Sequence, residues 1–362
     1  SNPPLDSDSR CNNMVHISLP ENKERRLVFY LAMEEYVAAH LSSLLAGRDR
    51  KDAFFFWQVK PTVIFGRNQV MEAEVNMPYC REHDIRLFRR KSGGGCVYSD
   101  EGNIMLSYIT DSTNVASTFS EYLDTLSAYL RASGVNAEKS GRNDVMVDGK
   151  KVSGNAFFLK PESSIVHGTM LFNTDFDELE RAITPSEAKI KSKGVSSVRQ
   201  HVTNLKPIYE AAGSPLADIE KFKNYLLECF CGNRDAEGKL AGIETIVLTD
   251  EQVAESEEIE AEYLKPEFLE GRNHAYSVSH SGKIPGAGEI VIGLDIDKGV
   301  IRKCHVSGDF FPLKDGLDEL LTSRLEGVPD EAGPLRKAIG DIELTDYISG
   351  LSMDDFLGIM EA

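Results

Sequence analysis

The dipeptide Asp148-Gly149, within the stretch "DVMVDGKKVSGNAFFL" (144–159), constrains the fold more than any other feature of the chain. Asp-Gly suits a two-residue type I′ turn, because both positions require a positive φ. The runs on either side of it are rich in side chains that favour β-strands. The stretch therefore predicts a β-hairpin with antiparallel strands on both sides of the turn.

Further short apolar runs bounded by turn residues predict more strands in the first half of the chain. They are "AFFFWQV" (53–59), "TVIFG" (62–66), 85–91, 95–98, 104–109 and 165–172. Apolar residues at helical spacing predict helices at 28–45, 71–83, 116–132 and about 215–231. Short strands joined by tight turns predict an α+β fold with a largely antiparallel sheet flanked by helices, rather than a doubly wound α/β fold.

A change of composition near residue 263 predicts two domains. The acidic run "DEQVAESEEIEAEYL" (250–264) leads into "KPEFLEGRN" (265–273), which we interpret as a hinge within 263–275. We expect a first domain over 1–262, with 1–13 as a flexible tail, and a small α+β domain over 263–362. Residues 288–310 predict a hairpin in this second domain, followed by two or three helices.

Charge is distributed unevenly along the 362 residues. Residues 207–362 carry 14 basic and 32 acidic side chains, whereas residues 1–206 carry 26 of each, so the net charge of −18 arises from the second part. This distribution argues against general nucleic-acid binding, which requires a basic face. No apolar run reaches the ~18–20 residues that span a membrane. The six cysteines lack metal-ligand spacing, so we expect a reduced, cytoplasmic protein.

The stretch "RRKSGGGCVYSDEGN" (89–103) places three glycines directly after a basic run. It lies between two predicted strands, so it is neither a P-loop nor a dinucleotide-binding loop, both of which lead into a helix. The N–H groups of Gly93–Gly95 allow close approach to a polyanion. Because side chains alternate along a strand, Arg89 and Lys91 share one face and Arg90 the other, so one face can direct a guanidinium at the anion. The alternative is a tight glycine turn with basic side chains on the surface.

The predicted hairpin brings an acid and a base close together. Asp144 begins one strand and Lys151 lies on the other, and these are residue types that bind Mg²⁺ and phosphate or carboxylate. A surface lysine and an Asx turn remain the alternative. His167, in a predicted strand, is a binding residue or a satisfied structural histidine. Cys96, after the glycines, is a nucleophile or a small buried thiol.

Seven motifs, taken in order over about 170 residues, together resemble the lipoate–protein ligase A family, which is related in fold to biotin protein ligases and class II aminoacyl-tRNA synthetases. They are "LAMEE" (31–35), "IFGRNQ" (64–69), "RRKSGGGCVYSDEGN" (89–103), "SGRND" (140–144), "KVSGNA" (151–156), "HGTML" (167–171) and "GVSSVRQHVTN" (194–204). Residues 288–311 resemble the accessory domain of the same ligases. A departure is Cys96, where the family often has alanine.

This resemblance implies a reaction in two steps. Lipoate and ATP, with Mg²⁺, form lipoyl-AMP and pyrophosphate, and a lysine of a carrier then takes the lipoyl group. The implied carriers are lipoyl domains of 2-oxoacid dehydrogenase E2 subunits or the glycine-cleavage H protein, and a monomer is expected. No membrane or nucleic-acid partner is expected.

The resemblance also implies site residues. Lys151 corresponds to the catalytic lysine that contacts both the acyl carbonyl region and the phosphate, and the basic loop around 189–204 to a segment that folds over the adenylate. The implied adenylate-binding residues are Arg90, Ser92, Gly93, Gly94, Gly95, Cys96, Val97, Tyr98, Lys151, Lys193 and Val195. The implied lipoate-binding residues are Lys151, Arg90, Gly95, His167 and Gly168, and Asp144 is the metal ligand that we expect.

Two other functions stay open from the sequence. Octanoyl- or lipoyltransferases of related fold use a cysteine acyl-enzyme and no ATP, and Cys96 is the candidate for that role. A non-catalytic binding protein would hold lipoate or nucleotide without releasing AMP. A biotin ligase requires a "GRGRxGR"-type loop, which this chain lacks.

Overall fold

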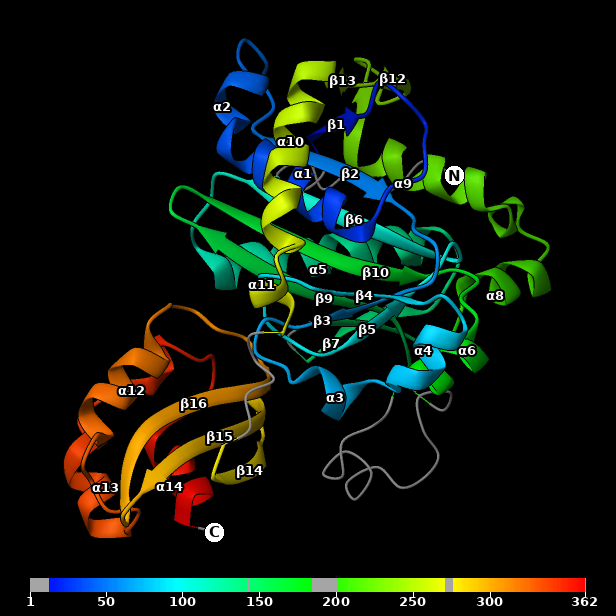
Figure 1. Ribbon diagram of the computed structural model, residues 1–362. Helices are drawn as coiled ribbons and strands as arrows, with labels where there is room; N and C mark the ends of the chain where they lie inside the picture. Colours follow the sequence, from blue (N-terminus) through cyan, green and yellow to red (C-terminus); the bar gives the residue numbers. More distant parts are fainter. Residues whose placement is uncertain (1–12, 142, 184–200, 271–275, 362) are drawn as a thin grey trace.

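The computed structural model describes residues 13–141, 143–183, 201–270 and 276–361. Figure 1 shows a large part, built on one broad sheet, and a smaller part with its own sheet, formed by the end of the chain. Both parts combine helices with strands. The α+β prediction is therefore confirmed.

The large sheet has eight strands, and most neighbours in it are antiparallel. Its order is β13 (Thr245–Val247), β1 (Met14–Ser18), β2 (Asp52–Trp57), β6 (Asn103–Thr110), β10 (Ser163–Leu171), β9 (Lys150–Lys160), β8 (Asp144–Val147) and β7 (Ala137–Ser140). Only the pairs β13–β1 and β1–β2 are parallel among them. The predicted largely antiparallel sheet is confirmed, and its parallel edge brings together segments more than 200 residues apart in the chain.

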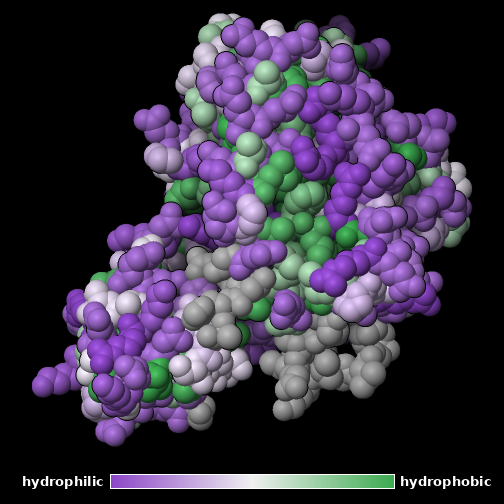
Figure 2. Space-filling model, viewed as in Figure 1, coloured by the Kyte–Doolittle hydropathy of each residue, from purple (hydrophilic) through white to green (hydrophobic). Residues whose placement is uncertain are grey.

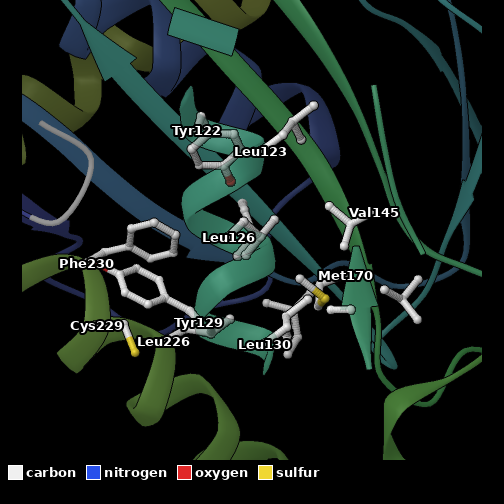
Figure 3. Packing of buried hydrophobic residues seen from close by; sticks show 14 of the residues in the cluster. Tyr122, Leu123, Leu126, Tyr129, Leu130, Val145, Met170, Leu226, Cys229 and Phe230 are labelled. Atoms are coloured by element: carbon white, nitrogen blue, oxygen red, sulfur yellow. The ribbon is translucent and has the colours of Figure 1, made fainter. Parts of the chain in front are cut away.

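Helices cover both faces of this sheet, because successive side chains of a strand point to opposite faces and both sets are apolar here. On β6, Ile104, Leu106 and Tyr108 face one core, whereas Met105 and Ile109 face the other. The first core packs against α5 (Val115–Ala132) and α9 (Ile219–Cys231), and the second against α1 (Leu27–Ala39) and α10 (Asp250–Tyr263). Figure 3 shows side chains of α5 between those of α9 and those of the strands β8 and β10. The remaining short elements of this region are α2 (Leu41–Leu44), α8 (Leu205–Ala211), η3 (Pro215–Ala217), β11 (Gly232–Arg234) and β12 (Leu240–Ile243).

A second, three-stranded sheet carries the glycine loop. Its order is β4 (Arg86–Arg89), β3 (Thr62–Phe65) and β5 (Val97–Ser99), and α3 (Met71–Glu74), α4 (Met77–Glu82) and α6 (Phe176–Ala182) pack beside it. The loop leaves β4 and returns in β5, so it connects two strands as the sequence predicts. The helix expected over 71–83 is divided in two, and Pro78 occupies the first turn of the second piece.

The smaller part has a separate hydrophobic core. Its antiparallel sheet is β14 (Val278–Ile284), β15 (Gly288–Asp297) and β16 (Val300–Phe310), covered by α12 (Leu317–Leu325), α13 (Ala332–Ile339), η4 (Leu344–Asp346) and α14 (Met353–Glu361). The short α11 (Pro266–Glu270), within the region expected as a hinge, packs on the first part through Phe268 and Leu269.

The turn of the predicted hairpin has the expected conformation, since φ is 51° at Asp148 and 78° at Gly149. We expect Gly149→Ala to lower the free energy of unfolding by about 1–2 kcal/mol, because a Cβ strains the left-handed backbone even where, as here, it meets no neighbouring atom. The measurement is urea unfolding of both proteins. Lys150→Ala, at the adjoining exposed position, is the control, and equal midpoints for all three proteins would contradict the expectation.

Side chains on the face drawn in Figure 2 are mostly hydrophilic, with one area of hydrophobic side chains in the middle of the large part. Within the described residues, none of the helices combines the length and the apolar character that crossing a membrane requires.

Candidate active site

A cavity of about 200 Å³ lies where the glycine loop, β9, β10 and the end of β16 meet. Apolar side chains, among them Ile64, Met105 and Phe311, form part of its wall. Eight of the residues singled out in the sequence line it: Arg90, Gly94, Gly95, Cys96, Val97, Lys151, His167 and Gly168. Sequence segments about 80 residues apart thus form one site with both charged and apolar walls.

The remaining predicted site residues lie next to the cavity, in the core of the second sheet, or outside the residues that the structure describes. Ser92, Gly93 and Asp144 adjoin its lining residues in the chain or in space. The side chain of Tyr98 is buried in the core of the second sheet and donates a hydrogen bond to Glu178 (2.9 Å). Burial raises the pKa of Tyr98, so its hydroxyl stays protonated. Lys193, Val195 and most of the expected covering loop lie outside the described residues.

The Arg90 guanidinium holds the glycine loop in shape. It donates to the carbonyl oxygens of Gly93 (2.7 Å) and Gly95 (2.7 Å), and more weakly to that of Ile64 (3.4 Å). Burial lowers the pKa of Arg90 to about 10, an effect that nearby Asp309 opposes. Arg90 therefore keeps its positive charge at neutral pH and places it beside the cavity.

The second part of the chain reaches into this site, which the sequence did not predict. Asp309 and Phe311 line the cavity, and Gly94 donates its N–H to the Phe310 carbonyl oxygen (2.8 Å). Gly94 has a φ of 91°, and a Cβ on Gly93 would lie 2.4 Å from the carbonyl oxygen of Phe310, the last residue of β16. Two glycines of the loop are thus required, Gly94 by its backbone conformation and Gly93 by the close approach of the β16 backbone.

Lys151 and Asp144 meet across the hairpin, as the sequence predicts. Their Nζ and Oδ1 atoms are 3.3 Å apart, although this Oδ1 makes no aligned hydrogen bond. The backbone of Lys151 is fixed as well, because its N–H donates to the His201 carbonyl oxygen (2.7 Å) and its carbonyl oxygen accepts from Thr203 (3.0 Å). A positioned ammonium therefore faces the cavity, with an acid beside it.

His167 is part of a buried hydrogen-bonded chain. Its Nε2 lies 2.6 Å from Ser92 Oγ, and its Nδ1 lies 2.8 Å from Glu34 Oε1. Glu34 comes from helix α1, and sequence reasoning did not select it as a site residue. The only signal was the motif "LAMEE", which places two acidic residues on a helix whose residues are otherwise largely apolar and buried.

Two family models match the chain over most of its length. "Lipoyl protein ligase A/B catalytic domain" matches residues 27–231, and "Bacterial lipoate protein ligase C-terminus" matches residues 273–360. The chain belongs to the lipoate–protein ligase family. It is accordingly a ligase with a catalytic domain and a C-terminal domain, as the sequence motifs indicate.

Curated lipoate–protein ligases resemble the chain throughout. Lipoate–protein ligase 1 of Staphylococcus aureus is 34% identical over 332 residues, which span 91% of this chain and 95% of that protein. LplJ of Bacillus subtilis is 31% identical over the same shares of the two chains. The match therefore includes the glycine loop, the hairpin and the C-terminal domain.

Solved structures of lipoate ligases share the fold. LipL1 of P. falciparum in complex with lipoate aligns with a TM-score of 0.67, at 19% identity, over 96% of this chain and 97% of that one. A lipoate–protein ligase A bound with ATP aligns with a TM-score of 0.57, at 24% identity, over 72% of this chain and 99% of that one. A bipartite ligase of Thermoplasma acidophilum, studied with its E2 lipoyl domain, gives 0.53 at 25% identity, over 74% of this chain and all of that one.

Of the five cysteines within the described residues, Cys96 is the one that lines the cavity, and it is partly exposed. Burial raises the pKa of Cys80 to about 11 and of Cys229 to about 12, and also raises the pKa values of Cys231 and Cys304. We expect iodoacetamide to modify Cys96 faster than these four in the folded protein, because alkylation requires an accessible thiolate. Peptide mapping by mass spectrometry measures each site, with the urea-unfolded protein as control. Equal labelling of all five in the folded state would contradict the expectation.

Proposed function

We propose that this ligase is ATP-dependent, activates lipoate to lipoyl-AMP and transfers the lipoyl group to a lysine of a carrier domain. The observation that supports this best is the meeting of Lys151, Arg90 and the glycine loop around one cavity. Two anions, the lipoate carboxylate and the α-phosphate, have to approach each other in the first step. Lys151 can contact both, and aligning them can contribute ~7–11 kcal/mol to lowering the barrier.

The phosphate oxygens have donors along the loop. Arg90 supplies positive charge, and the N–H groups of Gly93 to Gly95 are the proposed backbone donors. The other residues that we propose to contact the adenylate are Ser92, Cys96, Val97, Tyr98, Lys193 and Val195. His167 and Gly168 are assigned to the lipoate side of the cavity, with its apolar wall. In the described structure the Gly94 N–H donates to the Phe310 carbonyl oxygen, so nucleotide binding requires this contact to be exchanged.

Magnesium fits this site only as an ion held largely by the phosphates of the substrate. The described residues contain no cluster of three potential metal ligands, but Asp144 offers a carboxylate oxygen without a hydrogen bond, next to the cavity. Mg²⁺ commonly binds through one or two carboxylates together with phosphates and water. Asp144 would hold the ion, which would neutralise charge on the pyrophosphate.

The acceptors we propose are lipoyl domains of 2-oxoacid dehydrogenase E2 subunits or the glycine-cleavage H protein. The relationship to a ligase studied with its E2 lipoyl domain supports this choice. We further propose a cytoplasmic monomer with a boundary between its two domains near residues 263–275. The separate cores of the two parts support this boundary.

The test is lipoate-dependent formation of AMP and pyrophosphate from ATP, followed by mass measurement of an added E2 lipoyl domain. We expect AMP only when lipoate is present, and a carrier heavier by one lipoyl group. Cys96 in the cavity favours one second candidate, an ATP-independent acyltransferase with a cysteine acyl-enzyme. Acyl transfer without AMP formation, abolished by Cys96→Ala, would establish that candidate and overturn the ligase proposal.

A further inference from the structure

The acceptor amine has to lose a proton as it attacks the acyl group, and the proposed function leaves the proton acceptor unassigned. The described structure contains a group suited to this role, in the chain of hydrogen bonds through His167. Glu34 and Ser92 are both nearly fully buried, with exposed fractions of 2% each, whereas His167 lines the cavity. The three residues come from α1, the glycine loop and β10.

Further donors fix the orientation of the Glu34 carboxylate. Ser107 Oγ donates to Glu34 Oε2 (2.5 Å) and accepts a hydrogen bond from Trp57 Nε1 (2.9 Å). The other carboxylate oxygen, Oε1, is therefore left to accept the N–H of His167 Nδ1. A histidine with its hydrogen on Nδ1 has a lone pair on Nε2, so the carboxylate determines the tautomer. Ser92 then donates its hydroxyl hydrogen to Nε2.

We propose that His167, the member of this hydrogen-bonded chain that lines the cavity, is the proton acceptor of the transfer step, with Glu34 as the positioning residue; this inference rests on the proposed function. The amine nitrogen forms a bond to the acyl carbon, and the bond from that carbon to the phosphate oxygen breaks, so AMP leaves with the electron pair. The nitrogen gives one proton to His167 Nε2, from which the Ser92 hydroxyl turns away as the amine approaches. The Glu34 carboxylate stabilises the imidazolium that forms, which later loses its proton to solvent.

This role separates the two half-reactions. In the activation step the lipoate carboxylate attacks without losing a proton, so it needs no base. In the transfer step the amine needs one, and a positioned general base contributes about 10²- to 10⁴-fold. A change that removes the base while preserving the shape should therefore affect transfer far more than activation.

Several other charged or titratable groups lie near His167. Those that line the same cavity or adjoin it are Glu34, Arg90, Cys96, Asp144, Lys151 and Asp309. A variant that changes Glu34 alone leaves the other groups in place.

Glu35, the next residue of α1, is the matched control. It is also buried (5% exposed), but it binds Lys91 Nζ (3.0 Å), Lys160 Nζ (3.2 Å) and the hydroxyl of Tyr263 (2.6 Å) instead of His167. Glu35→Gln thus perturbs the packing of the same helix to a similar extent without changing the tautomer of His167.

The experiment compares wild type, Glu34→Gln and Glu35→Gln in the two half-reactions. Activation is measured as lipoate-dependent ATP–pyrophosphate exchange, and transfer as the rate at which lipoyl-AMP modifies an E2 lipoyl domain across a range of pH. We expect Glu34→Gln to slow transfer by about 100-fold while exchange changes by less than about threefold. The glutamine amide donates to Nδ1 and so places the hydrogen on Nε2. We expect Glu34→Gln to change the pH profile of transfer, leaving only the rise that follows deprotonation of the acceptor amine, whereas Glu35→Gln keeps both the ratio of the two rates and the wild-type pH profile.

Equal losses in both half-reactions, with an unchanged pH profile, would show a structural role for Glu34 and overturn the inference. An unchanged transfer rate in Glu34→Gln would overturn it as well. Both outcomes leave the proposed function intact, because wild type still forms AMP and modifies the carrier. Failure of the proposed function appears separately, as absence of lipoate-dependent exchange in wild type.

Discussion

Replacing Lys151 with alanine is expected to lower the rate of lipoate-dependent AMP formation by roughly 10³-fold, within the range found for removal of a single donor that stabilises a transition state. The ammonium faces the cavity beside Asp144, and its backbone is held by His201 and Thr203. Because the ammonium is already positioned, it stabilises the developing charge without reorganisation. The alanine variant loses this stabilisation. The reacting carboxylate and phosphate would then repel each other without a shared cation.

The measurement is the initial rate of AMP release with saturating ATP and lipoate. Lys150→Ala is the control, because Lys150 is the neighbouring exposed lysine of the same strand and does not line the cavity. Lys151→Arg adds a test of geometry, since a planar guanidinium cannot replace a compact ammonium between two anions. Similar rates for Lys151→Ala and Lys150→Ala would remove Lys151 from the mechanism.

Replacing Arg89 with methionine is expected to lower the free energy of unfolding by about 3–4 kcal/mol. Arg89 is 1% exposed, and its guanidinium donates to the carbonyl oxygens of Gly66 (3.0 Å), Gln69 (2.6 Å) and Leu269 (3.0 Å). Methionine fills much of the volume but leaves the Gln69 and Leu269 carbonyl oxygens without their donor, which costs about 1–3 kcal/mol for each, whereas the Gly66 oxygen still accepts the N–H of Gln69 (3.2 Å). The loop after β3 and the helix α11 would lose their common anchor.

Urea denaturation followed by circular dichroism measures this loss. Arg86→Met is the matched control: Arg86 begins the same strand, but it is 44% exposed and pairs with Glu24 at the surface, where ion pairs contribute little. A midpoint for Arg89→Met equal to that of Arg86→Met would contradict the expectation. Because the Asn68 carbonyl oxygen accepts the N–H of Gly308, loosening of the loop would also weaken its contact with the C-terminal domain.

Local sequence signals account for much of the fold. Asp148-Gly149 predicted the hairpin because turn conformation depends on the residues of the turn itself. The short apolar run of β6 likewise predicted a strand, although not that both of its faces are buried. The parallel pairing of β1 with β13 was not predicted, since no local pattern encodes a contact between residues more than 200 positions apart.

The sequence did not show which side chain of the basic run before the glycines reaches the cavity. From alternation alone, Arg89, Arg90 and Lys91 were all candidates for a nearby anion. In the fold, Arg89 is engaged by backbone carbonyls, and Lys91 binds Glu35 and Glu262. Arg90 lines the cavity. The partners of the other two come from the loop after β3 and from α1, α10 and α11, which the sequence could not place beside the glycine loop.

The sequence by itself determined the family, the strand-and-helix composition, the hairpin that pairs Asp144 with Lys151, and eight of the residues that line the cavity, because motifs and turn chemistry are properties of contiguous segments. Only the tertiary structure brought Glu34 to His167 across 133 positions and His167 to Ser92 across 75, and only it placed Asp309 and Phe311 in the cavity wall. Such contacts depend on how whole elements pack, and packing is decided by the burial of many side chains together rather than by any one segment.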